Sequence, residues 1–508
     1  MMMKKAQHII LILLILVAGL SFLRPSSAIA TPPVVIDSVY TATLSDNQRA
    51  LMRQAVDNFV ASKAMHNASV SVCVIDIASG EVVAAHNADS NLTPASVTKT
   101  ITSAAALKHF SPDYVFRTRV ECIGERTDDG VLDGDIVVVG GIDPTLGSKY
   151  FPDQPPFIDL VVDNLKAEGI KKINGVVRAR ETIAVYQAVP EKWDDDDVAE
   201  DYGAGIHSIN YCDNLFSLII DTSTGKAEVV DTIPHIKGLT IQNKMSVGRS
   251  GRFSPAMHRK KNTNDLVLTG TLRRTEDPIE AITTMPHPAE GLCADLREAL
   301  EADGIEVCGK KIDLEEDTLR LLSYASPKLS EILASLLHRS DNMYAESVQR
   351  RLGESLYGKP TLENGEKAVM NIVHQWGVET KNIKVYDGSG LSRTNRYSSH
   401  FLAEVLRGAA IDPITKDVFP SLLPVCGKDG TVRRLCKETS LSGLIALKSG
   451  SMRGVRCYAG YFPVEKPQFA VVMLANNFRC GTDTLISAIE DLLVGMFQQY
   501  LDNDNDNN

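Results

Sequence analysis

Three short polar clusters, widely spaced along this 508-residue chain, constrain its fold more than any other feature. In order they are Ser96-Val97-Thr98-Lys99, Ser340-Asp341-Asn342 and Lys448-Ser449-Gly450. Each alone is weak evidence, since the first pattern recurs at Ser223-Thr224-Gly225-Lys226 and the second at Ser45-Asp46-Asn47. The first repeat lies in a polar stretch typical of a turn, and the second precedes any candidate nucleophile. If these three clusters form one site, the two ends of the chain must fold together into one domain, and the long segment between the first two clusters must be an insertion.

Hydrophobic periodicity predicts a mixed fold, α/β or α+β, in which helices flank an antiparallel sheet drawn from both ends of the chain. Strand patterns occur at 69–77, 82–85, 444–448, 455–462 and 468–476. Helical patterns cover 47–63, 101–107, 328–337, 343–352 and 484–501. The second cluster therefore falls between two helices, and the third lies on or at the end of a strand.

Between about 118 and 320 the chain changes to short strand-like runs broken by Gly, Asp and Pro. Residues 134–140, 215–220 and 265–272 are examples. We predict a discontinuous catalytic domain at 31–117 plus 321–501, with one or two strand-rich subdomains inserted at 118–320. Residues 502–508 are only Asp and Asn and are predicted to be a disordered tail.

The N-terminus carries two lysines, an apolar run and then Ala28-Ile29-Ala30, which is typical of a secretory signal peptide cleaved near Ala30. An uncleaved membrane anchor is the alternative, although the run is shorter than the roughly 20 apolar residues of a spanning helix. The signal predicts a periplasmic protein. A formal charge of −11 argues against nucleic acid as a partner.

Nine cysteines are scattered along the chain without a C-x-x-C pair, and the histidines show no ligand spacing with them. We therefore expect no metal site and no cofactor. Export would permit disulfides, and Cys426 with Cys436 is the pair we would test.

The first cluster has the elements of an activated serine nucleophile. Ser96 and Lys99 are three residues apart and share one face of a helix. A serine hydroxyl needs a neighbouring base, and a buried lysine near a second cation loses its proton more easily. Lys448 supplies that second cation. Taken alone, the cluster also fits an ordinary capped helix with a surface lysine.

The other two clusters supply groups for a proton relay and for substrate binding. On a loop, Ser340 can pass a proton to a leaving amine while the Asn342 amide holds the substrate backbone. Lys448 and the Ser449 hydroxyl suit a substrate carboxylate, and Gly450 permits close backbone approach. The backbone N–H groups of Ser96 and Ser451 are the candidate oxyanion hole. A solvated turn and an edge strand are the simpler alternatives for these two clusters.

The ordered triplet matches the S-x-x-K, S-D-N and K-[ST]-G signature of penicillin-recognising serine enzymes. Three longer stretches are more specific still: Gly140-Gly141-Ile142-Asp143-Pro144-Thr145-Leu146, Tyr386-Asp387-Gly388-Ser389-Gly390-Leu391-Ser392 and Leu423-Pro424-Val425-Cys426-Gly427-Lys428-Asp429-Gly430-Thr431. With these residues the chain resembles the class C low-molecular-mass penicillin-binding proteins, the D-alanyl-D-alanine carboxypeptidase/endopeptidase family. The resemblance implies a penicillin-binding transpeptidase-like fold, an acyl-enzyme at Ser96, peptidoglycan stem peptides as substrate, and β-lactam antibiotics as ligands.

An acidic run follows Trp193, and Asp197 within it is a candidate for binding the free amine of a diaminopimelate side chain. A solvated charge run is the simpler interpretation.

Two other functions compete with a carboxypeptidase that also cleaves cross-links. One is a β-lactamase or esterase using the same acyl chemistry, and the other is a catalytically silent cell-wall binding protein. The long insertion argues against the former, and the intact clusters argue against the latter.

Overall fold

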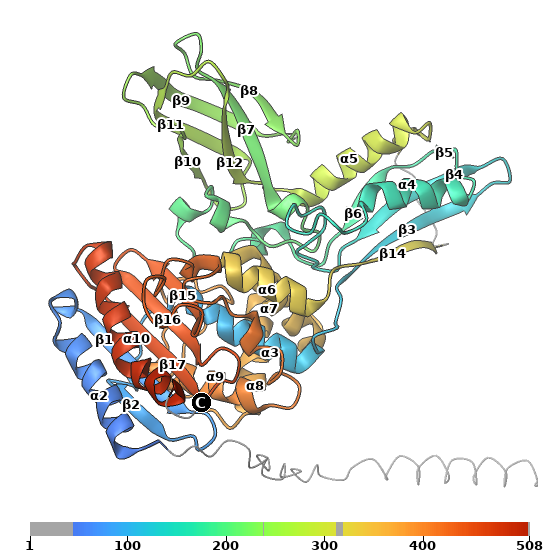
Figure 1. Ribbon diagram of the computed structural model, residues 1–508. Helices are drawn as coiled ribbons and strands as arrows, with labels where there is room; N and C mark the ends of the chain where they lie inside the picture. The colour runs from blue at the N-terminus through green and yellow to red at the C-terminus, as the bar shows by residue number, and fades with distance from the viewer. Residues whose placement is uncertain (1–43, 237, 311–317, 506–508) are drawn as a thin grey trace, which may run out of the picture. The chain divides into compact units, whose positions relative to one another are not determined.

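A computed structural model describes residues 44–236, 238–310 and 318–505. A five-stranded antiparallel sheet lies at its centre (Figure 1). In order across the sheet, the strands are β15 (Ala446–Met452), β16 (Val455–Phe462), β17 (Phe469–Asn476), β1 (Ser69–Asp76) and β2 (Val82–His86). Both ends of the chain therefore contribute to one sheet, as the sequence predicts.

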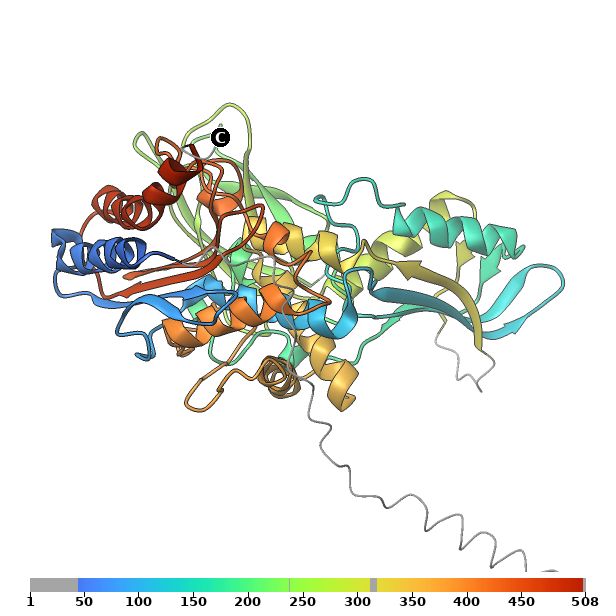
Figure 2. The same cartoon turned by 60° about the horizontal axis from the view of Figure 1, so that its bottom comes forward.

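Helices cover both faces of this sheet, and each face has its own hydrophobic core. On one face α2 (Asp46–Ala61) and α10 (Thr482–Asn505) lie side by side (Figure 2). The other face packs on α3 (Thr98–Phe110) and α9 (Ser399–Ile411). Along β1, alternate residues join the two cores, with Val72 on the first and Cys73 on the second. Strand periodicity thus gives the sheet two buried faces.

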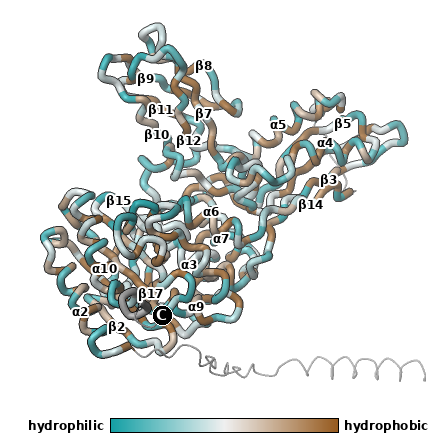
Figure 3. Tube along the Cα trace, viewed as in Figure 1, coloured by the Kyte–Doolittle hydropathy of each residue, from teal (hydrophilic) through white to brown (hydrophobic). Residues whose placement is uncertain are grey.

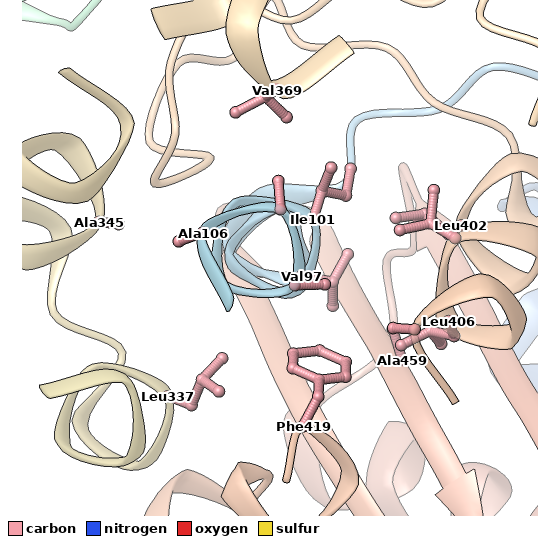
Figure 4. Close-up of a cluster of buried hydrophobic side chains, with 14 of the residues drawn as sticks. Val97, Ile101, Ala106, Leu337, Ala345, Val369, Leu402, Leu406, Phe419 and Ala459 are labelled. Atoms are coloured by element: carbon pink, nitrogen blue, oxygen red, sulfur yellow. The ribbon is translucent and has the colours of Figure 1, made fainter. Parts of the chain in front are cut away.

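Helix α3 carries the first polar cluster and is enclosed by protein. Every residue from Thr98 to Leu107 is buried. Figure 4 shows Ile101 and Ala106 of this helix surrounded by side chains of other elements, among them Leu337, Val369 and Leu406. Those neighbours belong to the helical layer formed by α6 (Leu329–Arg339), α7 (Asn342–Tyr357), α8 (Leu362–His374) and α9. A lysine in the first turn of α3 is consequently removed from water.

The first part of the insertion is a six-stranded sheet against two helices. Its strands are β3 (Arg117–Arg126), β4 (Val131–Val139), β5 (Lys172–Ile173), β6 (Val177–Arg180), β13 (Glu306–Val307) and β14 (Thr318–Ala325). The helices α4 (Phe157–Ala167) and α5 (Pro288–Ala302) share its hydrophobic core. Outgoing β3 pairs with returning β14, so the chain enters and leaves this part side by side.

The second part of the insertion consists of two three-stranded sheets. One has the order β12 (Ile279–Thr284), β7 (Leu215–Asp221), β8 (Glu228–Ile233), and the other β10 (Ala256–Arg259), β11 (Asp265–Arg273), β9 (Thr240–Gly248). Leu218 of β7 and Leu268 of β11 lie in one small core between the sheets. Outside that core β9 is largely polar, and Figure 3 shows β9 and its adjoining loops as largely hydrophilic, whereas β8 exposes Val230 and Ile233.

Most of the strands and helices predicted from the sequence are found, with small shifts at their ends. The second copies of the Ser-x-x-Lys and Ser-Asp-Asn patterns lie outside the site. Ser223 lies in the turn between β7 and β8, and Ser45 caps α2 by accepting from Gln48 N–H. One boundary is wrong: α10 continues through 502–505, which we expected to be a tail, because its helical hydrogen bonding extends past residue 501. The signal peptide lies outside the described residues.

The proposed Cys426–Cys436 disulfide is not formed, since both thiols are free and buried. Burial raises the pKa of the Cys436 thiol to about 12, which keeps it protonated and unreactive. In the described residues, no helix combines the length and apolarity needed to cross a membrane.

Candidate active site

Ser96 lies in a 3₁₀ turn, Ala95–Val97, directly before α3. Asn476 of β17 fixes the start of this segment, since its side chain accepts from Thr93 N–H at 2.9 Å and donates to Thr93 O at 3.0 Å. Ala95 has a φ of 50°, in the left-handed region that costs a non-glycine residue about 1–3 kcal/mol. The nucleophile candidate is therefore held in a strained and firmly anchored turn.

Lys99 faces Ser96 from the first turn of α3, with Nζ 3.1 Å from the Ser96 Oγ. Its amine donates to Asn342 Oδ1 and to the carbonyl oxygen of Ser389, each at 2.6 Å. A neutral amine has two hydrogens, so these two acceptors use both and leave the lone pair directed at the Ser96 hydroxyl. Burial lowers the pKa of Lys99 to about 8, against the opposing effect of nearby carboxylates. An appreciable neutral fraction exists near neutral pH.

Ser340 and Lys448 form the second pair, with Lys448 Nζ 2.9 Å from Ser340 Oγ. Ser340 ends α6 in the left-handed conformation (φ 62°), and Asp341 caps α7 by accepting from Tyr344 N–H. This tight connection turns Ser340 toward the strand, whereas Asn342, which we expected on the loop, is the first residue of α7. Burial, and then the charge of Lys99, lower the pKa of Lys448 well below its usual value. The charge of Lys99 thus favours loss of a proton from Lys448, whereas burial is what lowers the pKa of Lys99.

The Asn342 side chain serves the protein itself more than we predicted. Its oxygen accepts from Lys99, and its nitrogen donates to the carbonyl of Tyr202 at 2.8 Å. Asn342 thereby orients the lysine and ties the catalytic helices to the insertion. One amide hydrogen is left for a substrate backbone.

The third cluster lies on β15, which is an edge strand of the central sheet. Ser449 is paired with Thr431, their hydroxyl oxygens 2.7 Å apart. Gly450 packs against the nucleophile turn, because a Cβ there would lie 2.7 Å from Pro94 O and 3.1 Å from Ser96 N. Gly450 therefore allows close approach of the protein's own backbone, and the approach of a substrate backbone stays a prediction. Ser451 follows at the exposed end of the strand.

A buried carboxylate layer behind Lys99 was not recognised from the sequence. Glu346 accepts from Ser389 N–H at 2.8 Å, and the carbonyl of that same Ser389 accepts from Lys99. Asp387 accepts from Gly390 N–H at 2.8 Å and from Ser392 N–H at 2.6 Å. The Asp-Gly-Ser-Gly-Leu-Ser stretch did point to a turn at this site. Its acidic partner Glu346 sits in an unremarkable helical pattern, so no local signal identified it.

Part of the insertion reaches this layer through Trp193, whose indole N–H donates to Asp387 Oδ2 at 2.9 Å. Asp197 is half-buried and accepts from the Tyr202 hydroxyl at 3.0 Å. Because the Tyr202 carbonyl bonds Asn342, Asp197 is linked to the catalytic clusters through one residue. Burial raises the pKa of Asp197. Asp197 is thus connected to the site, whereas Asp194, Asp195 and Asp196 of the same run are exposed.

The geometry brings together a serine, a buried amine aimed at it, and a second serine–lysine pair. Among the described residues, no group of three or more His, Cys, Asp or Glu is placed to hold a metal ion. The arrangement is that of a serine enzyme working through an acyl intermediate, in which lysine replaces the histidine of other serine hydrolases.

Comparison with known proteins agrees with this class. The D-Ala-D-Ala carboxypeptidase 3 (S13) family matches residues 52–499, and the chain belongs to that family of serine peptidases. It is 26% identical over 501 residues to a D-alanyl-D-alanine carboxypeptidase of Actinomadura sp., covering 94% of this chain and 91% of the relative. A carboxypeptidase of Haemophilus influenzae is 24% identical, with 82% and 88% covered.

The fold is that of a penicillin-binding protein. The crystal structure of penicillin binding protein 4 from Haemophilus influenzae superposes with a TM-score of 0.72 at 22% identity, covering 88% of this chain and 99% of the other. The same protein in complex with a β-lactam gives a TM-score of 0.69, at 23% identity and 86% and 98% coverage. The penicillin-binding fold inferred from the resemblance is confirmed.

Proposed function

We propose that the protein is a serine-type D-Ala-D-Ala carboxypeptidase that trims peptidoglycan stem peptides. The single observation that carries this proposal is the position of the buried Lys99 amine. Its two acceptors, Asn342 Oδ1 and the Ser389 carbonyl, leave the nitrogen lone pair directed at the Ser96 hydroxyl. Family membership supports the reaction type, and the β-lactam complex of a protein with the same fold supports penicillin as a ligand.

In the proposed reaction, the Ser96 hydroxyl gives its proton to neutral Lys99 as Oγ attacks the carbonyl of the penultimate D-alanine. The backbone N–H groups of Ser96 and Ser451 receive the developing oxyanion. The C–N bond then breaks, and the proton that Lys99 received passes to the leaving D-alanine through Ser340, which is bonded to Lys448, so that Lys99 is neutral again. Water next attacks the ester while Lys99 accepts a proton from it, and Lys99 returns that proton to Ser96 Oγ as the acyl–oxygen bond breaks.

Recognition of substrate is proposed to use β15 and its neighbours. An extended peptide can pair with the open edge of β15, and the Ser449–Thr431 hydroxyl pair is suited to the terminal carboxylate. Asp197 is proposed to bind the amine of a diaminopimelate side chain. Binding such an amine would admit cross-linked peptides and give the enzyme endopeptidase activity as well.

The family acts on cell-wall substrate, so the protein is proposed to work in the periplasm after removal of the signal peptide at 1–30. The division into a catalytic part at 31–117 plus 321–501 and an insertion at 118–320 is retained as a prediction.

The test is labelling with a fluorescent penicillin, comparing the wild-type protein with Ser96→Ala and locating the adduct by mass spectrometry. We expect a stoichiometric adduct on the Ser96 peptide of the wild type alone. Absence of an adduct in a folded wild-type protein would support the silent wall-binding alternative. Rapid release of hydrolysed penicillin, with no cleavage of D-alanyl-D-alanine peptides, would support the β-lactamase alternative.

A further inference from the structure

Positive charge is concentrated in one sheet of the insertion. Residues 240–274, which form β9, β10 and β11, hold eight Lys and Arg and a single Asp, for a formal charge of +7 in a protein of −11. Two of these cations have structural roles. Arg259 is buried and donates to the Thr284 carbonyl, and Lys261 donates to the carbonyls of Glu191 and Trp193. The other six are exposed, at positions 244, 249, 252, 260, 273 and 274.

Four of the exposed cations lie at one end of this sheet. Arg252 is held beside β11 by two backbone hydrogen bonds, from its N–H to Thr271 O and from Arg273 N–H to its own carbonyl. Arg249 follows Gly248, which pairs with Arg273 in the strand register. We name Arg249, Arg252, Phe253, Arg273 and Arg274 the arginine tip.

The arginine tip has a well-packed backbone, and its charges have no carboxylate partners. A Cβ at Gly251 would lie 2.1 Å from the Leu272 carbonyl carbon, so the turn between the arginines is packed closely on β11. Throughout the described chain, none of the four arginines has a carboxylate within ion-pair distance. Arg274 Nε donates to the carbonyl oxygen of Ser223 at 2.9 Å, a neutral acceptor that leaves its charge uncompensated. The charges of all four arginines are therefore available to an external anion.

An exposed aromatic ring stands among these charges. Phe253 is 62% exposed, and the guanidinium of Arg273 lies 5.0 Å from the centre of its ring. The guanidinium of Arg273 stabilises the exposed ring through a cation–π contact, and an aromatic ring among arginines also suits the interface of an anionic membrane. There the ring enters the headgroup layer while the guanidinium groups meet lipid phosphates.

We propose that the arginine tip docks the insertion on an anionic phospholipid surface. The neighbouring sheet supports one-sided binding, because its exposed charges are mainly acidic: Glu228, Asp231 and Glu280. A purely electrostatic polyanion would have no use for Phe253, and the ring is what favours a lipid surface. The proposal is independent of the proposed enzymatic function.

The experiment measures sedimentation of the full-length mature protein with vesicles of equal parts phosphatidylglycerol and phosphatidylcholine. Each arginine near a charged surface contributes about 1 kcal/mol, so replacing all four with glutamine should weaken binding by roughly 1,000-fold at low salt. Phe253→Ser should weaken it by roughly tenfold or more, with a smaller salt dependence than the loss of arginines. Vesicles of phosphatidylcholine alone should bind the wild type weakly.

The matched control removes an equal number of positive charges, four, from exposed positions outside the arginine tip. It combines Lys63→Gln, Lys381→Gln, Arg434→Gln and Arg479→Gln. This variant should bind vesicles as the wild type does, and both variants should react normally with penicillin, which verifies folding. Equal vesicle binding by the two variants would overturn the proposal. So would a wild type that binds soluble polyphosphate but not vesicles, or binding unaffected by Phe253→Ser.

Discussion

The central sheet and the paired sheets of the insertion both bury apolar side chains against a neighbouring layer, but their cores differ greatly in size. Every residue of β17 is buried, and the core on the α3 face alone contains 46 buried residues. In the insertion, β7 alternates between buried and half-buried residues, and the core between the sheets contains 13. Helices cover both faces of the first sheet, whereas each sheet of the pair has one face in water.

The difference shows what the site requires. Two lysines without exposed surface are tolerated only where surrounding elements hold every acceptor in place, and the doubly covered sheet supplies that rigidity. The paired sheets bury a single cation, Arg259, whose guanidinium donates to the Thr284 carbonyl, and most of their other charged side chains are exposed. The catalytic clusters therefore lie beside the central sheet, and the paired sheets of the insertion offer mainly their exposed surface for interactions. Five predictions test this contrast, the first four in order of decreasing effect.

Removing the buried amine should have the largest effect. Lys99→Ala deprives Ser96 of its base, and we expect penicillin acylation to slow by about 1,000- to 10,000-fold. Rapid-quench labelling with a fluorescent penicillin measures the rate. Lys108→Ala on the same helix is the control, because Lys108 pairs with Asp412 away from the clusters and should leave the rate unchanged. An unchanged rate in Lys99→Ala would refute the role of the buried lysine.

Equivalent leucine truncations should separate the two regions. Leu406→Ala in the core of Figure 4 and Leu268→Ala between the paired sheets each leave a cavity, and each should lower the free energy of unfolding of its own region by about 3 kcal/mol. Denaturant titration followed by both tryptophan fluorescence and penicillin labelling distinguishes them. Labelling should be lost at lower denaturant only in Leu406→Ala. If Leu268→Ala shifts the labelling curve equally, the two regions unfold as one unit.

A single methyl group at Gly450 should disturb the catalytic region without unfolding it. The new Cβ would press on Pro94 O and Ser96 N, displacing β15 from the nucleophile turn, and we expect acylation to fall by roughly 10- to 100-fold. Gly481→Ala is the matched control, since open space surrounds that position. Rates that are equal in the two variants would show that β15 does not position the turn.

The carboxylates behind Lys99 should have the smallest effect, visible in the pH profile. Burial lowers the pKa of Lys99, whereas the carboxylates of Asp387, Asp341 and Glu346 raise it. Because the neutral amine is the active form, acylation should rise as pH increases through about 8. Glu346→Gln keeps an acceptor for Ser389 N–H but removes a charge, so the rise should move to lower pH by about half a unit. A purely structural role for Glu346 would change the rate at all pH values equally.

Burial also makes Glu346 pH-dependent in stability, since it raises the pKa of this carboxyl from 4.5 to about 7. The folded state binds the proton more tightly than the unfolded state does. Its contribution to stability is therefore complete below pH 4.5 and is lost as pH rises through about 7. Glu346→Gln should remove this dependence in denaturant titrations at pH 5 and pH 8.

Much of the site could be predicted because each cluster is local. Ser96 and Lys99 share a helix face by spacing alone, and the short Ser340–Asn342 connection had to be a turn between helices. The carboxylate Glu346 could not be found this way, since its partner Ser389 lies 43 residues further along. The contacts that Asn342 and Gly450 make within the protein could not be foreseen either, because their partners are distant protein segments, and their expected roles toward substrate stay predictions.

The sequence by itself determined the elements, the order of the clusters and the chemistry each residue can perform, since these depend on side-chain type and local periodicity. Tertiary structure decided how they combine. It placed two buried lysines against each other, enclosed α3 so that its lysine lost water, and gave Asp387 its indole partner from the insertion. Such long-range contacts set desolvation and charge, and no local pattern encodes them.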